Sequence, residues 1–84
     1  MISVIIKSEN GLHARPASAF VAKAAGYTSE ITLEVDGKIA NGKSIMNVLG
    51  LGIACGAEVK VTAVGGDSAL AEKELAEILG EAHD

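Results

Sequence analysis

Apolar and polar residues alternate in three stretches of the chain, which begin at Ile2, Ile31 and Val59. A period of two residues is typical of strands that bury one face. The Asp36-Gly37 pair after the second stretch is a strong hairpin turn signal, and it leads to a shorter strand around Lys38 to Ala40. The pattern thus predicts four strands, with the second and third paired as a hairpin.

Three other segments have the spacing of helices. Apolar residues from Ala17 to Ala24 recur every three or four positions, and Pro16 suits the first turn of that helix. Ser44 precedes a short apolar segment, IMNVLGLGI, and is a suitable N-cap for it. Asp67 is a suitable N-cap for a third helix, whose glutamates we expect to face water. The apolar face of this helix would consist of Ala71, Leu75, Ile78 and Leu79.

The predicted order is β-α-β-β-α-β-α, without repeats or linkers, so we expect one α+β domain over residues 1–84. Short crossovers in this order favour a split β-α-β arrangement, in which one sheet carries its helices on a single face. Apolar residues make up 49% of the chain, but aromatic residues only 2%. The core must therefore be aliphatic, and recognition of nucleic acids by base stacking is disfavoured.

The net charge of −4 is unevenly distributed. Residues 67–84 contain six acids and only Lys73 as a base, whereas residues 1–66 carry a small positive excess. The overall acidity disfavours direct binding to a nucleic-acid backbone. No apolar run approaches the roughly 20 residues of a membrane span, and the single cysteine, Cys55, cannot form an internal disulfide. We expect a cytoplasmic protein that does not insert into membranes.

One segment matches a nucleotide-binding motif. GKIANGKS, from Gly37 to Ser44, has the pattern G-x-x-x-x-G-K-[ST] of a phosphate-binding loop. In such a loop the first glycine follows a buried parallel strand, whereas Gly37 belongs to a predicted hairpin turn. The chain is also too short for the parallel sheet and the second acidic strand of these enzymes. We therefore reject nucleotide binding.

The segment NGLHARPA, residues 10–17, places His13 and Arg15 at the start of a predicted helix. Backbone N–H groups and the positive end of the helix dipole make this a favourable place for an anion. The dipole also disfavours the imidazolium, so we expect a neutral His13 near pH 7 with one nucleophilic ring nitrogen. The guanidinium of Arg15 would hold a phosphoryl group in place. A second interpretation stays open, in which His13 caps a turn and Arg15 lies over the surface.

Glu9 is the only other acid or base near this segment. A histidine that is served by the active site of a partner therefore fits better than an independent enzyme. Ser44 has two compatible interpretations, a helix cap and a phosphorylation site. Because Ile45, Met46 and Leu49 cannot all be buried in so short a helix, we expect part of this stripe to form an exposed docking patch.

The remaining candidates are weaker. We interpret Cys55 as a thiol in a turn without a catalytic role, and we expect His83 to lie in a mobile terminal tail. No spacing of Cys, His or carboxylate residues suggests a metal site, and nothing calls for a cofactor.

NGLHARPA and GKSIMNVLGLGIACGAEV, on a chain of this length and element order, closely resemble HPr, the histidine-containing phosphocarrier family of the phosphoenolpyruvate-dependent sugar phosphotransferase system. The resemblance covers essentially the whole chain. It implies an open-faced β-sandwich, a four-stranded antiparallel sheet in the order 1-4-2-3 with three helices on one face. It also implies a monomeric carrier with no cofactor.

The resemblance further implies roles for individual residues. His13 would accept a phosphoryl group from phosphorylated enzyme I on Nδ1 and pass it to sugar-specific IIA proteins or domains, while Arg15 contacts the phosphate. Ser44 matches the serine that HPr kinase/phosphorylase modifies in many Gram-positive lineages, where the product acts with a catabolite-repression regulator. The implied docking surface consists of Ser18, Ile45, Met46, Asn47 and Leu49.

Two positions depart from common members of the family. Asn47 stands where many have Gly or Lys, and Cys55 where several have a polar or basic residue. Asn47 could therefore tune the choice of partner. Some relatives keep the serine and lose the histidine, which leaves a regulatory module that docks a transcription regulator through phosphorylated Ser44 as the alternative function. The presence of His13 argues against it.

Overall fold

The structure is a computed structural model that describes residues 1–80, so His83 lies outside the described residues. It confirms the predicted order of elements. These are β1 (Ile2–Ile5), α1 (Ala14–Ala24), β2 (Glu30–Val35), β3 (Lys38–Asn41), α2 (Ile45–Gly50), β4 (Glu58–Val64) and α3 (Ser68–Gly80).

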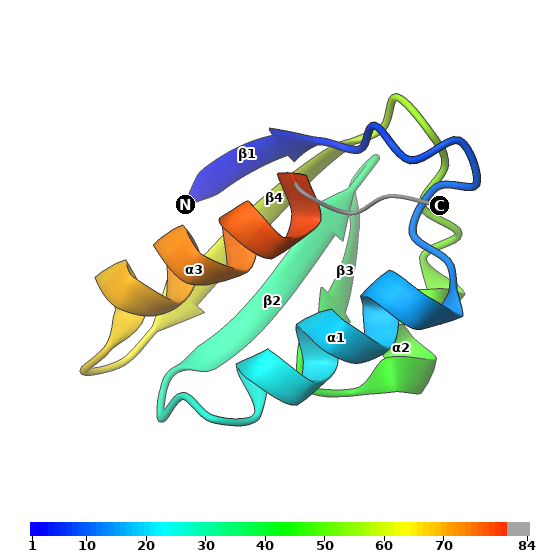
Figure 1. Cartoon of the computed structure of the whole chain (residues 1–84). Coiled ribbons are helices and arrows are strands. Elements are labelled where there is room, and N and C mark those ends of the chain that lie inside the picture. Colours follow the sequence, from blue (N-terminus) through cyan, green and yellow to red (C-terminus); the bar gives the residue numbers. More distant parts are fainter. Residues whose placement is uncertain (81–84) are drawn as a thin grey trace.

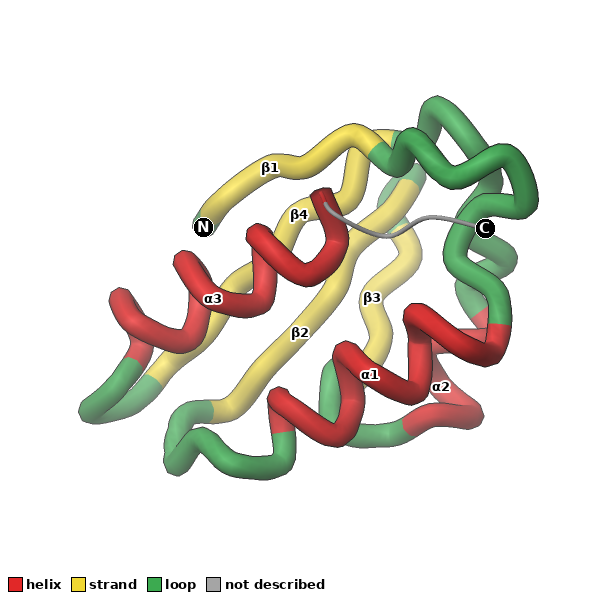
Figure 2. The backbone as a smooth tube through the Cα atoms, viewed as in Figure 1, coloured by secondary structure: helices red, strands yellow, loops and turns green. Residues whose placement is uncertain are grey.

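The four strands form one antiparallel sheet in the order β1-β4-β2-β3, as the family resemblance implied. The helices lie on one face of this sheet, where α3 packs against β1 and β4 and α2 packs against β3 (Figures 1 and 2). The opposite face is open. In the predicted hairpin, Val35 pairs with Lys38, and Asp36 and Gly37 make the turn with φ of 51° and 80°. Gly37 therefore belongs to a hairpin, in agreement with the rejection of a phosphate-binding loop.

The core between the sheet and the helices is aliphatic apart from Phe20 and Tyr27. Phe20, Leu33 and Leu75 are fully buried and come from α1, β2 and α3, so each layer contributes. The alternation of apolar and polar residues that predicted the strands matches the observed burial. Every second residue of β2 and β4 is buried and faces the helices. Within residues 1–80, none of the helices combines the length and the apolar character that a bilayer crossing requires.

The side chain of Asp67 has a different role from the predicted cap of α3. Its carboxylate accepts hydrogen bonds from the backbone N–H groups of Thr28 and Ser29, at 2.9 and 3.0 Å, and from the Ser29 hydroxyl. These bonds lower the pKa of Asp67 to about 2. Only the backbone carbonyl of Asp67 serves the helix, by accepting from Ala71. The carboxylate thus fixes the loop before β2.

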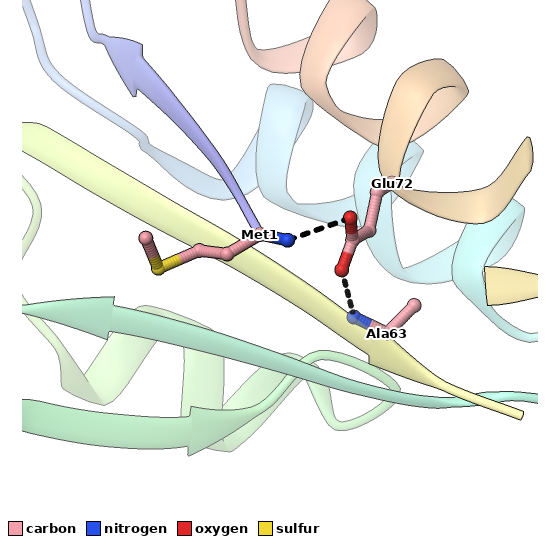
Figure 3. A network of polar contacts seen from close by, with 3 residues as sticks. All are labelled: Met1, Ala63 and Glu72. Atoms are coloured by element: carbon pink, nitrogen blue, oxygen red, sulfur yellow. Dashed lines mark hydrogen bonds and ion pairs between the residues drawn. The ribbon is translucent and has the colours of Figure 1, made fainter. Parts of the chain in front are cut away.

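The prediction that the glutamates of α3 face water is wrong for two of them, which bind other parts of the protein. Glu72 accepts from the terminal ammonium of Met1 at 2.8 Å and from the backbone N–H of Ala63 at 2.9 Å (Figure 3). These contacts lower its pKa. Glu74 accepts from the hydroxyl of Tyr27, and burial together with this bond raises the pKa of Tyr27 to about 12. Both carboxylates therefore join α3 to other elements.

Candidate functional site

The loop that leads to His13 is held against the segment that precedes β4. The backbone N–H of Leu12 donates to the carbonyl of Ile53 at 3.0 Å. Gly11 adopts a φ of 68°, and an added β-carbon would lie 2.2 Å from the same carbonyl oxygen. Both the left-handed backbone and the close approach require glycine at this position. In Figure 1 the two segments lie next to each other beyond the start of α1.

His13 is the N-cap residue of α1, and its backbone is extended, with φ of −87° and ψ of −172°. Its carbonyl accepts from the N–H of Ala17, which begins the helical hydrogen bonds. The side chain does not cap the helix amides, and Nε2 is shielded from solvent. The imidazole therefore lies at the positive end of α1 with one of its two nitrogens enclosed by the protein.

Arg15 occupies the first turn of α1, and its side chain is exposed. Among residues 1–80 its guanidinium makes no hydrogen bond or ion pair. Pro16 is buried in the same turn, where a residue without an N–H is tolerated. The sequence therefore puts His13 and Arg15 on one turn, with the histidine half-buried and the arginine in water. An exposed guanidinium is available to an incoming anion.

Ser44 is the N-cap of α2, as predicted. Its Oγ accepts from the backbone N–H of Asn47 at 3.3 Å, and its carbonyl accepts from Val48 at 3.0 Å. The side-chain amide of Asn47 also donates to Oγ, at 3.1 Å. Ser44 itself is partly exposed.

The apolar stripe of α2 is divided between core and surface. Val48 is buried, and Ile45 is partly buried against the core, so these two residues anchor the helix. Met46, Asn47 and Leu49 of α2 remain exposed. Ser18, on α1, is exposed as well. Because α1 and α2 pack against each other, the predicted docking residues belong to neighbouring helices. Part of the stripe is thus exposed, as the sequence indicated.

The other features that could form a site are a surface depression, the thiol of Cys55 and clusters of metal-binding side chains. A depression of about 350 Å³ runs along β2 and β3, and it contains none of the predicted site residues. Cys55 is exposed in a turn, with Sγ 4.0 Å from the carbonyl oxygen of Lys7. No cluster of three or more His, Cys, Asp or Glu residues in the described part of the chain is arranged to hold a metal ion.

Two features of the site did not emerge from the sequence patterns. The first is the contact of Gly11 with Ile53; the Asn-Gly dipeptide at residues 10–11 is a turn signal that would have indicated the unusual φ but not the contact. The second is the bond from the side chain of Asn47 to Ser44, which joins a residue assigned to docking to the proposed modification site. A spacing of three residues within one helical turn permits this bond but does not reveal it.

The chain is similar to known proteins in both sequence and structure. The family described as "PTS HPr component phosphorylation site" matches residues 2–81. The phosphocarrier protein HPr of Borreliella burgdorferi is 49% identical over 75 residues, which are 89% of this chain and 87% of that protein. Residues 10–17 and residues 44–49 both lie within the family match.

Two solved structures extend the similarity to the fold. The histidine-containing phosphocarrier protein of Mycoplasma matches with a TM-score of 0.89 and 39% identity, over 92% of this chain and 88% of that one. Crh, the catabolite repression protein of Bacillus subtilis, matches with a TM-score of 0.80 and 41% identity, over 96% of this chain and 93% of that one.

Proposed function

The chain belongs to the HPr family, the phosphocarriers of the phosphotransferase system, and on that premise we propose that His13 is the residue that carries the phosphoryl group. The group arrives from phosphorylated enzyme I and leaves to a sugar-specific IIA protein or domain. The observation that supports this role is the position of His13 at the start of α1, with Nε2 enclosed and Arg15 exposed on the same turn. Because Nε2 is shielded, Nδ1 is the nitrogen that accepts phosphorus.

A carrier must release the group as readily as it takes it up. As the bond from phosphorus to the donor breaks, the Nδ1–P bond forms, and the next partner reverses this order. A hold that is too strong would favour the first transfer and stall the second. The exposed guanidinium of Arg15 acts in water, where a charge-assisted contact is weaker than in a closed pocket. Partial exposure therefore suits transfer in both steps.

Phosphate labelling tests this assignment. With enzyme I and phosphoenolpyruvate, the wild-type chain should gain one acid-labile, base-stable phosphate, and His13→Ala should gain none. His83→Ala is the matched control, because residue 83 is the only other histidine, and it should label like the wild type. Labelling that survives in His13→Ala would refute the role of His13.

Phosphorylation of Ser44 is the proposed regulation of this carrier. A phosphate would add a charge of about −1.5 to −2 beside the exposed side chains of Met46 and Leu49. These apolar residues, with Ser18, Ile45 and Asn47, form the proposed docking surface. Negative charge on this surface weakens docking to enzyme I. An HPr kinase/phosphorylase is the proposed source of the modification, and a catabolite-repression regulator is the proposed reader.

Ser44→Asp should slow the phosphorylation of His13 by enzyme I, mainly through a higher KM. Ser3→Asp is the control, because Ser3 is exposed on β1 at the opposite edge of the sheet from α2. It introduces the same charge and should leave the kinetics unchanged. Identical kinetics for the two variants would contradict a regulatory role of Ser44.

The similarity to Crh, whose name refers to catabolite repression, favours one second candidate. This is a regulatory module that acts mainly by docking a transcription regulator through phosphorylated Ser44. The two candidates differ in their use of His13. A chain that takes no phosphate from enzyme I, yet binds the regulator once Ser44 is phosphorylated, would have the second function.

A further inference from the structure

Asn47 makes two separate contacts with the hydroxyl of Ser44. Its backbone N–H donates to Oγ at 3.3 Å, and its side-chain Nδ2 donates to the same atom at 3.1 Å. A hydroxyl oxygen has two lone pairs for accepting hydrogen bonds. Both are therefore engaged by one residue. The backbone bond is the cap of α2, whereas the side-chain bond depends on the amide group of Asn47.

This double contact opposes the reaction proposed for Ser44. In that reaction Oγ attacks the γ-phosphorus of ATP, and the Oγ–P bond forms. The bond from phosphorus to the β–γ bridging oxygen breaks, ADP leaves, and the hydroxyl proton passes to a base of the kinase. Two donors directed at Oγ withdraw electron density from it and occupy both lone pairs of the hydroxyl, so release of one of the two hydrogen bonds makes Oγ a better nucleophile.

The side-chain bond is the one that can be released without damage to the fold. Loss of the backbone bond would leave an amide of α2 without its cap. The Asn47 side chain is exposed, so rotation about its side-chain torsions moves it away from Oγ without opening the core. Its amide then finds water as a partner.

We propose that the side chain of Asn47 restrains Ser44 against phosphorylation and so sets how readily this chain is modified. The inference rests on the proposed phosphorylation of Ser44 and adds a positioning residue to it. Chains with a residue that cannot donate at this position would be modified faster. Asn47 thus affects the reaction through its contact with the attacking oxygen of Ser44, and it does not contact ATP.

The test compares the rates at which an HPr kinase of a Gram-positive bacterium, with ATP and Mg²⁺, phosphorylates Ser44 in several variants. Asn47→Leu and Asn47→Ala both remove the donor and keep the backbone N–H that caps α2. Because a hydrogen bond contributes modestly once its groups regain water, kcat/KM should rise about threefold to tenfold in both. The melting temperature should change little. A rise in kcat would show that the hydrogen bond from Asn47 to Ser44 breaks during the chemical step. A fall in KM would show that it breaks when the kinase binds.

Asn41→Leu is the matched control. Asn41 is exposed just before α2, and its side chain accepts from Lys43 rather than contacting Ser44. An equal rise in this control would overturn the inference, because surface apolarity would then explain the effect. A fall or no change in both Asn47 variants would overturn it while Ser44 phosphorylation stands. If neither the wild type nor the variants are phosphorylated, the proposed regulation itself fails, and the inference with it.

A second measurement does not depend on a kinase. The side-chain amide resonances of Asn47 in an NMR spectrum should shift in Ser44→Ala, because the acceptor of Nδ2 is removed. Unshifted resonances would show that the bond does not persist in solution and would overturn the inference.

Discussion

Gly11 lies so close to Ile53 that a β-carbon at residue 11 would come within 2.2 Å of the Ile53 carbonyl oxygen. The N–H of Leu12 donates to that carbonyl at 3.0 Å. His13 follows directly, so the position of the proposed phosphate carrier depends on a contact between segments that are far apart in the sequence. The first prediction tests this dependence.

Gly11→Ala should destabilise the fold and slow phosphorylation of His13. The control is Gly52→Ala, because Gly52 has a similar φ of 62° and no atom near its missing β-carbon. The control incurs only the backbone penalty of about 1–2 kcal/mol. Gly11→Ala must also displace the carbonyl of Ile53, so its loss of unfolding free energy in urea should be clearly larger. Equal losses would mean that the close approach is unimportant.

Arg15→Ala should reduce the rate of phosphoryl transfer far more than it reduces stability. A charge-assisted hydrogen bond to the phosphoryl group that exists only during transfer predicts a loss of about tenfold or more in kcat/KM. Lys38→Ala removes another exposed cation, from β3, and should change neither the rate nor the melting temperature. Normal transfer together with a lower melting temperature in Arg15→Ala would favour the interpretation of Arg15 as a surface residue.

Met46→Lys should raise the KM for enzyme I by tenfold or so, since a charge replaces an apolar contact at the proposed docking surface. Ile39→Lys provides the comparison. The exposed fractions of Met46 and Ile39 are 75% and 68%, but Ile39 pairs with Glu34 on the open face of the sheet, away from the helices. If Ile39→Lys impairs transfer as much as Met46→Lys, the docking surface has been assigned to the wrong face.

Glu72→Gln should lower the unfolding free energy at pH 7 by about 1.5–3 kcal/mol, the usual contribution of hydrogen bonds to a charged acceptor. Contacts with Met1 and Ala63 lower the pKa of Glu72 in the folded state. Its stabilisation is therefore present above the ordinary pKa of 4.5 and is lost as the pH falls below that value. Urea unfolding from pH 7 to pH 3 should show the wild type converging on the variant. Glu77→Gln, at an exposed site on α3, is the control and should leave the unfolding free energy at pH 7 nearly unchanged.

Asp67→Asn should lower the melting temperature at neutral pH, and this difference should disappear in acid. The pKa of Asp67 is about 2 in the folded chain, against an ordinary value of 3.8. The carboxylate therefore stabilises the fold above pH 3.8, and this contribution is lost as the pH falls through about 2. Asp36→Asn is the control, because the turn residue Asp36 has a φ of 51° that asparagine also tolerates. A pH-independent loss in Asp67→Asn would point to packing rather than charge.

The sequence was sufficient to predict the elements of this fold because their signals are local. Alternation over five or six residues identified β2 and β4, and the Asp36-Gly37 pair identified the hairpin between β2 and β3. The same holds for the placement of His13 and Ser44 at helix starts, since the cap and the first turn lie within a few residues. The strand order came from the family resemblance rather than from periodicity.

The roles of Asp67, Glu72 and Glu74 could not be predicted in this way. Asp67 directly before α3 and the two glutamates on α3 are ordinary polar residues in the sequence pattern. Only the tertiary fold brings Thr28, Ala63 and Met1 within hydrogen-bond distance of Asp67 and Glu72. The contact of Gly11 with Ile53 is equally non-local. Local patterns report which face of an element is apolar, but they carry no information about which distant backbone amide a carboxylate meets.

The strand order also has a consequence for how the chain is made. β1 pairs with β4 and with no other strand of the described sheet. During synthesis from the N-terminus, the first strand emerges early but must remain unpaired until residues 58–64 have followed it. The loop that leads to His13 cannot be fixed until Ile53 has been synthesised, because the carbonyl of Ile53 accepts the hydrogen bond from Leu12. The proposed phosphate-carrying site therefore assembles only after Ile53 and β4 have been synthesised, and a truncated chain that stops before them would contain His13 without the contact that fixes its loop.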